Sequence, residues 1–86
     1  MKTVSVGTLE SSDCLVTIKP HESLEIEIDT VVHDAFYEHI SDLVRKTLKE
    51  HGITKAYVIV QDKGALDYAI KARLTTAIKR MRDDNG

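Results

Sequence analysis

The sequence has few of the residues that hold very small proteins together. Its 86 residues include one cysteine, one proline and no tryptophan, and aromatic residues make up 5% of the chain. The single cysteine, Cys14, cannot form an internal disulfide, and no cysteine and histidine cluster has zinc-finger spacing. A hydrophobic core must therefore stabilise the fold. We expect one domain over residues 1–86, too small to enclose a deep active site.

Long hydrophobic runs and a dominant charge are also absent. No stretch approaches the roughly 20 apolar residues that cross a membrane, and the first residues hold no apolar segment long enough for a signal peptide. The net charge is −2, although residues 43–86 contain ten of the twelve basic residues. These bases are spread along expected helices with few aromatic residues between them, which is not typical of nucleic-acid binding. We expect a cytoplasmic protein that binds neither membranes nor nucleic acids.

Alternation of apolar and polar residues predicts strands at residues 14–19 and 24–28. The four residues between them have the length of a hairpin connection, so we predict that these two strands pair antiparallel. A shorter strand is indicated near residues 4–6. Residues 56–60 are apolar on both faces, which indicates an interior strand with neighbours on each side or cover on both faces.

Helical periodicity predicts a first helix from about residue 32 to 50, followed by Gly52 as a left-handed C-cap. A second helix is predicted from about residue 65 to 82, with Asp62 as its N-cap. The predicted apolar stripes are Val32, Phe36, Ile40, Leu43, Thr47 and Leu48 on the first helix and Leu66, Ile70, Leu74, Ala77, Ile78 and Met81 on the second. The order β(β)βαβα predicts an α+β fold, with two helices packed on one face of a three- to four-stranded mixed sheet. The last residues, 82–86, are expected to fray.

No catalytic or metal-binding constellation is evident. His33 and His39 are six residues apart on the first helix and face different directions, and no metal-ligand motif is present. Cys14 falls on the apolar side of its strand, where a buried thiol is inert. The carboxylates of Glu25 and Glu27 project toward solvent, where nothing raises their pKa toward general-acid values. We therefore predict no catalytic residues and no metal site.

The remaining candidate is the loop at residues 7–13, which is rich in turn-forming residues and precedes the first confident strand. Its chemistry alone fits an ordinary surface loop, because no base or oxyanion donor is evident near its serines. An exposed serine hydroxyl can nevertheless serve as an attachment point, since the modifying enzyme supplies the activation.

Three stretches carry a resemblance to a known family. These are the motif GTLES at residues 7–11 with Asp13 after it, the strands through residues 24–28, and the motif DKGALD at residues 62–67 leading into residues 72–74. Together they resemble the acyl carrier (gamma) subunit of bacterial citrate lyase over nearly the whole chain. Two features depart from that pattern: Ser12 stands where we expect glycine in relatives, and the chain ends soon after the last helix.

The resemblance implies a non-catalytic carrier with a covalent arm. Ser11, which closes the GTLES motif, would carry a phosphodiester-linked 2′-(5″-phosphoribosyl)-3′-dephospho-CoA, attached by a prosthetic-group transferase. The thiol of this group would hold acetyl, which the transferase (alpha) subunit of citrate lyase exchanges for citryl. The lyase (beta) subunit would then cleave the citryl thioester to oxaloacetate and regenerate acetyl. The neighbouring hydroxyl of Ser12 leaves open which of the two serines is modified.

Two alternatives remain from the sequence. One is the carrier subunit of malonate decarboxylase, which uses a similar prosthetic group on a similar small protein. The other belongs to a different class, a cofactor-free regulatory or adaptor module, since many small α+β domains only bind partners.

Overall fold

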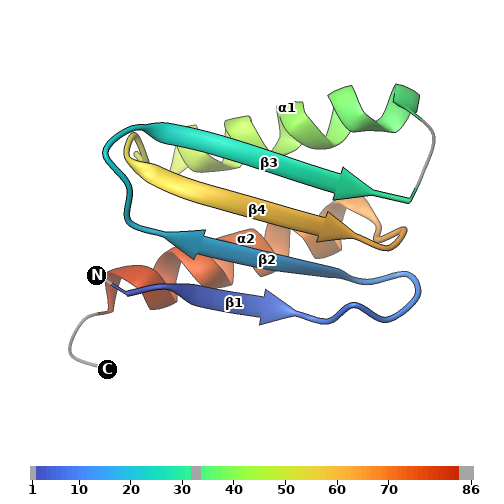
Figure 1. Cartoon of the computed structure of the whole chain (residues 1–86), viewed down its shortest axis with the longest axis horizontal. Helices are drawn as coiled ribbons and strands as arrows, with labels where there is room; N and C mark the ends of the chain where they lie inside the picture. Colours follow the sequence, from blue (N-terminus) through green and yellow to red (C-terminus); the bar gives the residue numbers. More distant parts are fainter. Residues whose placement is uncertain (1, 32–33, 84–86) are drawn as a thin grey trace.

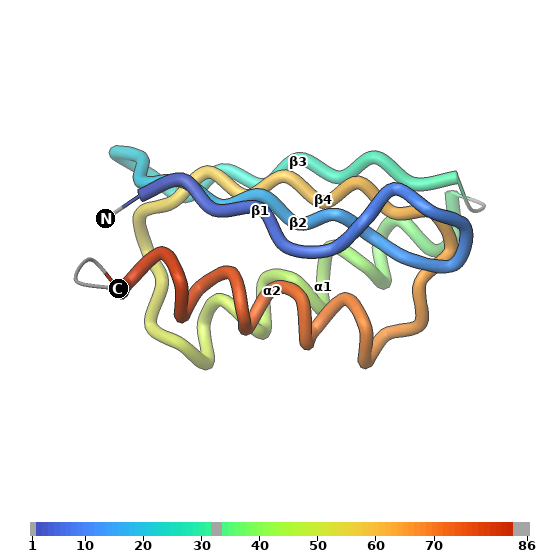
Figure 2. Tube along the Cα trace, turned by 90° about the horizontal axis from the view of Figure 1, so that it is seen from below, coloured from blue at the N-terminus to red at the C-terminus, as the bar shows by residue number. Residues whose placement is uncertain are grey.

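The computed structural model describes residues 2–31 and 34–83, and within them an α+β fold as predicted. The elements follow the order β1 (Val4–Gly7), β2 (Cys14–Lys19), β3 (Leu24–Thr30), α1 (Asp34–Glu50), β4 (Ala56–Asp62) and α2 (Asp67–Arg82). The four strands form one mixed sheet, and both helices lie on the same face of it (Figures 1 and 2). The other face of the sheet carries no helix in the part of the chain that is described.

The predicted hairpin between the second and third strands is wrong. The sheet has the order β1-β2-β4-β3, so β4 lies between them, antiparallel to β2 and parallel to β3 (Figure 1). Residues 20–23 instead carry the chain past the end of β4, where the Ala56 amide donates to the Ser23 carbonyl at 3.1 Å. The connection length suits a hairpin, but β4 is the most apolar strand and gains most from the central position. The predicted interior character of residues 56–60 is confirmed.

The core lies between the sheet and the two helices. Along β4, alternate residues from Ala56 to Asp62 are buried against the helices, and the residues between them are half-buried on the open face. Residues with no exposed surface come from both layers: Val16, Ile18, Val58 and Val60 on the sheet, and Val44, Leu48, Leu74 and Ile78 on the helices. Cys14 belongs to the same core.

The end of α1 follows the sequence prediction. Gly52 has φ of +68°, and its amide donates to the Lys49 carbonyl at 3.0 Å. The amide of Ile53 donates to the Leu48 carbonyl at 2.9 Å, which completes a left-handed C-cap.

The start of α2 differs from the prediction. The helix begins at Asp67. Asp62, the predicted N-cap of this helix, is instead the last residue of β4. The Asp62 side chain is buried and accepts two hydrogen bonds, from the Ala65 amide at 2.9 Å and the Thr30 hydroxyl at 2.8 Å. It therefore stabilises the turn between β4 and α2 and ties that turn to β3.

The predicted apolar stripes hold except where each helix begins, at Phe36 in the first turn of α1 and at Leu66 just before α2. Ile40, Leu48, Ile70 and the later members are buried as predicted, with Leu43 partly buried. Phe36 and Leu66, however, are 55% and 63% exposed, because the two helices do not close over each other where they begin and a groove remains there. Val32 and residues 84–86 lie outside the described residues.

None of the helices in the described ranges is long and apolar enough to cross a bilayer.

Candidate functional site

The two sequence motifs lie side by side at one end of the sheet. The β1–β2 loop (residues 8–13) and the turn between β4 and α2 (residues 63–66) both emerge at the same end in Figure 1. Their backbones are directly joined: the Ser12 amide donates to the Lys63 carbonyl at 2.8 Å, and the Lys63 amide donates to the Asp13 carbonyl at 2.9 Å. GTLES and DKGALD therefore form one structural unit, although they are far apart in sequence.

Gly7, the last residue of β1 before the loop, stands at a position that accepts no side chain. Its φ is +113°, and a Cβ atom placed there would lie 1.9 Å from the backbone carbonyl oxygen of Cys14. Gly7 pairs with Leu15 in the β1–β2 ladder, so a side chain would have to push β2 away. The glycine of the motif is thus a steric requirement of the fold.

Thr8 and Asp13 close the base of the loop from either side. The Thr8 hydroxyl donates to Asp13 Oδ2 at 2.7 Å and accepts from the Glu10 amide at 3.2 Å. The Thr8 amide donates to the Cys14 carbonyl at 3.1 Å, and the Cys14 amide donates to Asp13 Oδ1 at 2.7 Å. These four hydrogen bonds hold the two ends of the loop together and tie them to β2.

Arg73 on α2 anchors this base to the helix layer. Its Nη2 lies 3.2 and 3.1 Å from the two Asp13 carboxylate oxygens, and its Nε lies 3.4 Å from Oδ1. The hydrogen bonds from the Thr8 hydroxyl and the Cys14 amide lower the pKa of Asp13, and Arg73 lowers it further. The carboxylate is therefore ionised near neutral pH and holds the loop against α2.

Ser11 and Ser12 occupy the tip of the loop. The Asp13 amide donates to the Glu10 carbonyl at 3.1 Å, which closes a β-turn with the two serines at its centre. Ser12 has φ of +66°, and it is the one described residue other than glycine with a positive φ. That backbone conformation explains the expectation of glycine at position 12.

The Ser11 side chain is exposed, and no described residue forms a hydrogen bond with its hydroxyl. Within residues 2–31 and 34–83, no basic side chain is bonded to it that would activate it as a nucleophile. The arrangement suits a hydroxyl that another enzyme modifies: the loop is fixed at its base, and the serine stands free at its tip.

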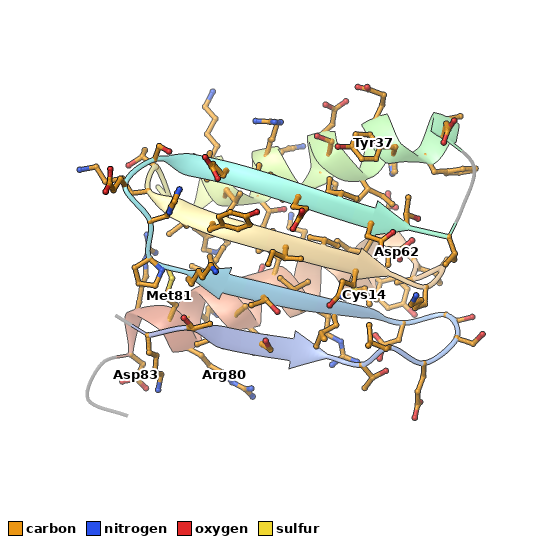
Figure 3. All side chains as sticks on the ribbon, in the orientation of Figure 1. Cys14, Tyr37, Asp62, Arg80, Met81 and Asp83 are labelled. Atoms are coloured by element: carbon orange, nitrogen blue, oxygen red, sulfur yellow. The ribbon has the colours of Figure 1, made fainter. Side chains whose placement is uncertain are left out.

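The other candidate residues have no catalytic arrangement. Cys14 is fully buried, and burial, followed by the charges of Asp13 and Asp62, raises the pKa of its thiol to about 11. The prediction of a buried thiol is confirmed. Figure 3 shows Cys14 at the start of β2, at the same end of the sheet as Asp62 at the end of β4. Glu25 and Glu27 are exposed on β3 as predicted.

The histidines form no metal site in the part of the chain that the structure describes. His39 is exposed, and its Nε2 pairs with an Asp67 carboxylate oxygen. His33 lies outside the described residues. No group of three or more histidine, cysteine, aspartate or glutamate side chains within residues 2–31 and 34–83 is placed to hold a metal ion.

An open groove lies between the first turns of α1 and α2, and the sequence did not predict it. It has a volume of about 620 Å³, and its walls include Phe36, Leu66, Tyr68 and Ile70. Phe36 and Leu66 sit at helical spacing from core residues, so their pattern indicated the core. Nothing in a single sequence distinguishes an apolar residue of the core from one that lines a groove beside it.

Comparisons with known proteins agree on a carrier protein. A family model described as "ACP: Malonate decarboxylase delta subunit (MdcD)" matches residues 1–81. The citrate lyase acyl carrier protein of Haemophilus influenzae (strain PittEE) is 49% identical over 83 residues, covering 96% of this chain and 87% of the relative. The protein of the same name from Halothermothrix orenii is 41% identical over 80 residues, covering 92% of this chain and 85% of the relative.

The fold is also shared with chains of solved structures. A chain in the crystal structure of a Pseudomonas malonate decarboxylase hetero-tetramer in complex with malonate has a TM-score of 0.80. The match covers 93% of this chain and 84% of that chain, at 21% sequence identity.

Proposed function

This chain belongs to the family of citrate lyase acyl carrier proteins, and we propose that it carries acyl groups on an arm attached covalently to Ser11. The single observation that supports Ser11 is its position, an exposed and unbonded hydroxyl at the tip of a loop whose base is fixed. A protein of this family is a carrier and not an enzyme, so its residues present the arm, and other subunits perform the chemistry.

The proposed arm is 2′-(5″-phosphoribosyl)-3′-dephospho-CoA, joined to the Ser11 hydroxyl oxygen by a phosphodiester. When bound, this group supplies a thiol that holds acetyl or citryl as a thioester, which stabilises charge at the carbon being cleaved. The described residues fit such a group because Ser11 is exposed and the loop that carries it emerges at one end of the sheet (Figure 1). A prosthetic-group transferase would load the protein.

The chain itself then performs two tasks. The bonds from Arg73 and Lys63 to the loop fix where the arm begins, and the free tip leaves the arm able to move. A tether raises the local concentration of its cargo at each partner, so one carrier can serve several active sites. The proposed partners are the transferase (alpha) and lyase (beta) subunits of citrate lyase, in the cytoplasm.

A second candidate is the carrier subunit of a malonate decarboxylase, favoured by the family model and by the fold shared with a chain of the Pseudomonas enzyme. The 49% identity to a citrate lyase carrier, against 21% to that chain, favours citrate lyase. Restoring activity to complexes that lack their own carrier distinguishes the two. We expect the loaded protein to restore citrate cleavage and not malonate decarboxylation.

The attachment is tested by the intact mass of protein purified from its native host. We expect a covalent adduct on the wild-type chain and on Ser12→Ala, and none on Ser11→Ala. The Ser12→Ala variant is a matched control because it removes the neighbouring hydroxyl and leaves that of Ser11. An unmodified wild-type chain, or an adduct that persists in Ser11→Ala, would contradict the proposal.

A further inference from the structure

The groove between the first turns of α1 and α2 begins next to the loop that carries Ser11. Gly64 lines the groove, and the residue before it, Lys63, exchanges backbone hydrogen bonds with Ser12 and Asp13 of the loop. Both helices begin at the end of the sheet where the loop emerges (Figure 1). A flexible chain attached at Ser11 therefore starts close to the groove.

The groove has the size and surface of a site for a small molecule. Its volume of about 620 Å³ falls within the roughly 300 to 1,000 Å³ of such sites. Phe36, Leu66 and Tyr68 line it and are 55%, 63% and 74% exposed. Apolar side chains this exposed and gathered around a hollow indicate a surface that is covered in some functional state.

The polar groups of the groove restrict what it can bind. Its polar side-chain groups are the carboxylates of Asp62 and Asp67, the imidazole of His39 and the hydroxyl of Tyr68. No lysine or arginine lines the groove among the described residues. Asp62 is already bonded to Thr30 and Ala65, and Asp67 to His39. An anionic ligand would meet carboxylates with no cation to pair with, whereas a neutral chain with alkyl segments and a few amides would suit the apolar walls.

We infer that the groove binds the neutral, thiol-bearing end of the arm carried on Ser11 while no catalytic subunit holds it. This inference rests on the proposed function. Among the possible occupants, we favour the arm because its attachment beside the groove raises its local concentration there. The thiol end of the arm is also uncharged, and small molecules bind in concave sites such as this groove. Bound there, the thioester would be partly shielded from water, and the shallow groove would still release it to a partner.

The test measures how fast the arm thiol reacts with iodoacetamide in the loaded protein, with intact mass identifying the modified group. Cys14 does not interfere, because it is fully buried and the pKa of its thiol is about 11. The groove is opened by Phe36→Ser and by Leu66→Ser, which change exposed side chains and leave the core intact. Tyr37→Ser is the matched control, because Tyr37 is exposed beside Phe36 on α1 but does not line the groove.

We expect Phe36→Ser and Leu66→Ser to react faster than the wild type and Tyr37→Ser to react at the wild-type rate. If the groove holds the arm about four fifths of the time, the wild-type thiol reacts about fivefold more slowly than a free one. Comparison of the loaded protein with Ser11→Ala by NMR should also show chemical-shift changes concentrated at the groove.

The outcomes separate this inference from the proposed function. A native protein without an adduct would contradict both. An adduct whose thiol reacts equally fast in all four proteins, with no shift changes at the groove, would overturn the inference alone. Groove variants that weaken binding to the catalytic subunits without changing thiol reactivity would also overturn it, since the groove would then dock a protein.

Discussion

The base and the tip of the β1–β2 loop differ in how their side chains are held. At the base, Thr8 and Asp13 bond to each other, to β2 and to Arg73 on α2. At the tip, the side chains of residues 9–12 are exposed and form no hydrogen bonds within the described chain. A carrier needs both properties, because the attachment point must be found in a fixed place and its hydroxyl must be free.

This difference between the base and the tip predicts that substitutions at the base lower the free energy of unfolding and that substitutions at the tip do not. The largest effect is expected for Gly7→Ala, since the new methyl group would overlap the Cys14 carbonyl and the residue has φ of +113°. We expect a loss of about 3 kcal/mol in the free energy of unfolding, measured by urea denaturation.

Gly52→Ala is the matched control for this substitution. Gly52 also has a positive φ, of +68°, but an added Cβ meets nothing within 4 Å. Only the backbone conformation is then penalised, and the expected loss is about 1 kcal/mol. Equal losses at the two glycines would show that contact with Cys14 does not matter and that the base is less rigid than described.

The next effect is a pH dependence that comes from Asp13. Its folded-state pKa is lowered below the ordinary 3.8, mainly by the Thr8 hydroxyl and the Cys14 amide. The unfolded chain binds a proton more readily than the folded chain, so the stabilisation is present above the unfolded pKa and is lost as the pH falls through the folded pKa. Thermal unfolding from pH 6 down to pH 2 should show this loss at the acidic end.

In Asp13→Asn, the unfolding temperature should fall less steeply as the pH is lowered toward 2, because the carboxylate that titrates has been removed. Asp29→Asn is the control, since Asp29 is an exposed acid on β3 for which no comparable set of bonds is described. A wild-type curve that falls no more steeply than the Asp13→Asn curve below pH 4 would mean that the carboxylate does not hold the base.

A smaller effect, of opposite sign, is expected at the tip. Ser12 has φ of +66°, which costs a residue with a side chain about 1 kcal/mol relative to glycine. Ser12→Gly should therefore increase the free energy of unfolding by up to about 1 kcal/mol in urea denaturation. Ser11→Gly should give no such gain, because Ser11 does not have a positive φ. A loss of stability in Ser12→Gly would contradict the described turn.

The sequence predicted the features that depend on neighbouring residues and not those that depend on contacts between distant segments. Local patterns located the strands, the helices and the Gly52 cap, because period and capping depend on neighbouring residues. They failed for the order of the sheet, since the four-residue connection after β2 fits a hairpin as well as a crossing past β4. Asp62 was misassigned for a similar reason: an aspartate before a helix can cap it, but this one bonds to Thr30 on a neighbouring strand.

The candidate site was predictable only where it is carried by a motif. The resemblance pointed to Ser11, but it could not reveal that Arg73 reaches Asp13 or that Lys63 bonds to the loop. Those contacts join segments far apart in the chain, and no local pattern encodes them. The groove could not be predicted from the sequence either, because apolar residues that line it, such as Leu66, continue the helical periodicity of the core residues.

The smallest effect on stability is expected at Ser11 itself, where the effect on function should be greatest. An exposed hydroxyl without hydrogen-bond partners contributes little to folding, so Ser11→Ala should change the free energy of unfolding by less than about 0.5 kcal/mol. Urea denaturation of the unmodified proteins measures this, with Thr8→Ala as the control, because the Thr8 hydroxyl bonds to Asp13 and its loss should destabilise the loop. If Ser11→Ala were as destabilising as Thr8→Ala, the hydroxyl at the tip would be structural, and it would not be free to receive an arm.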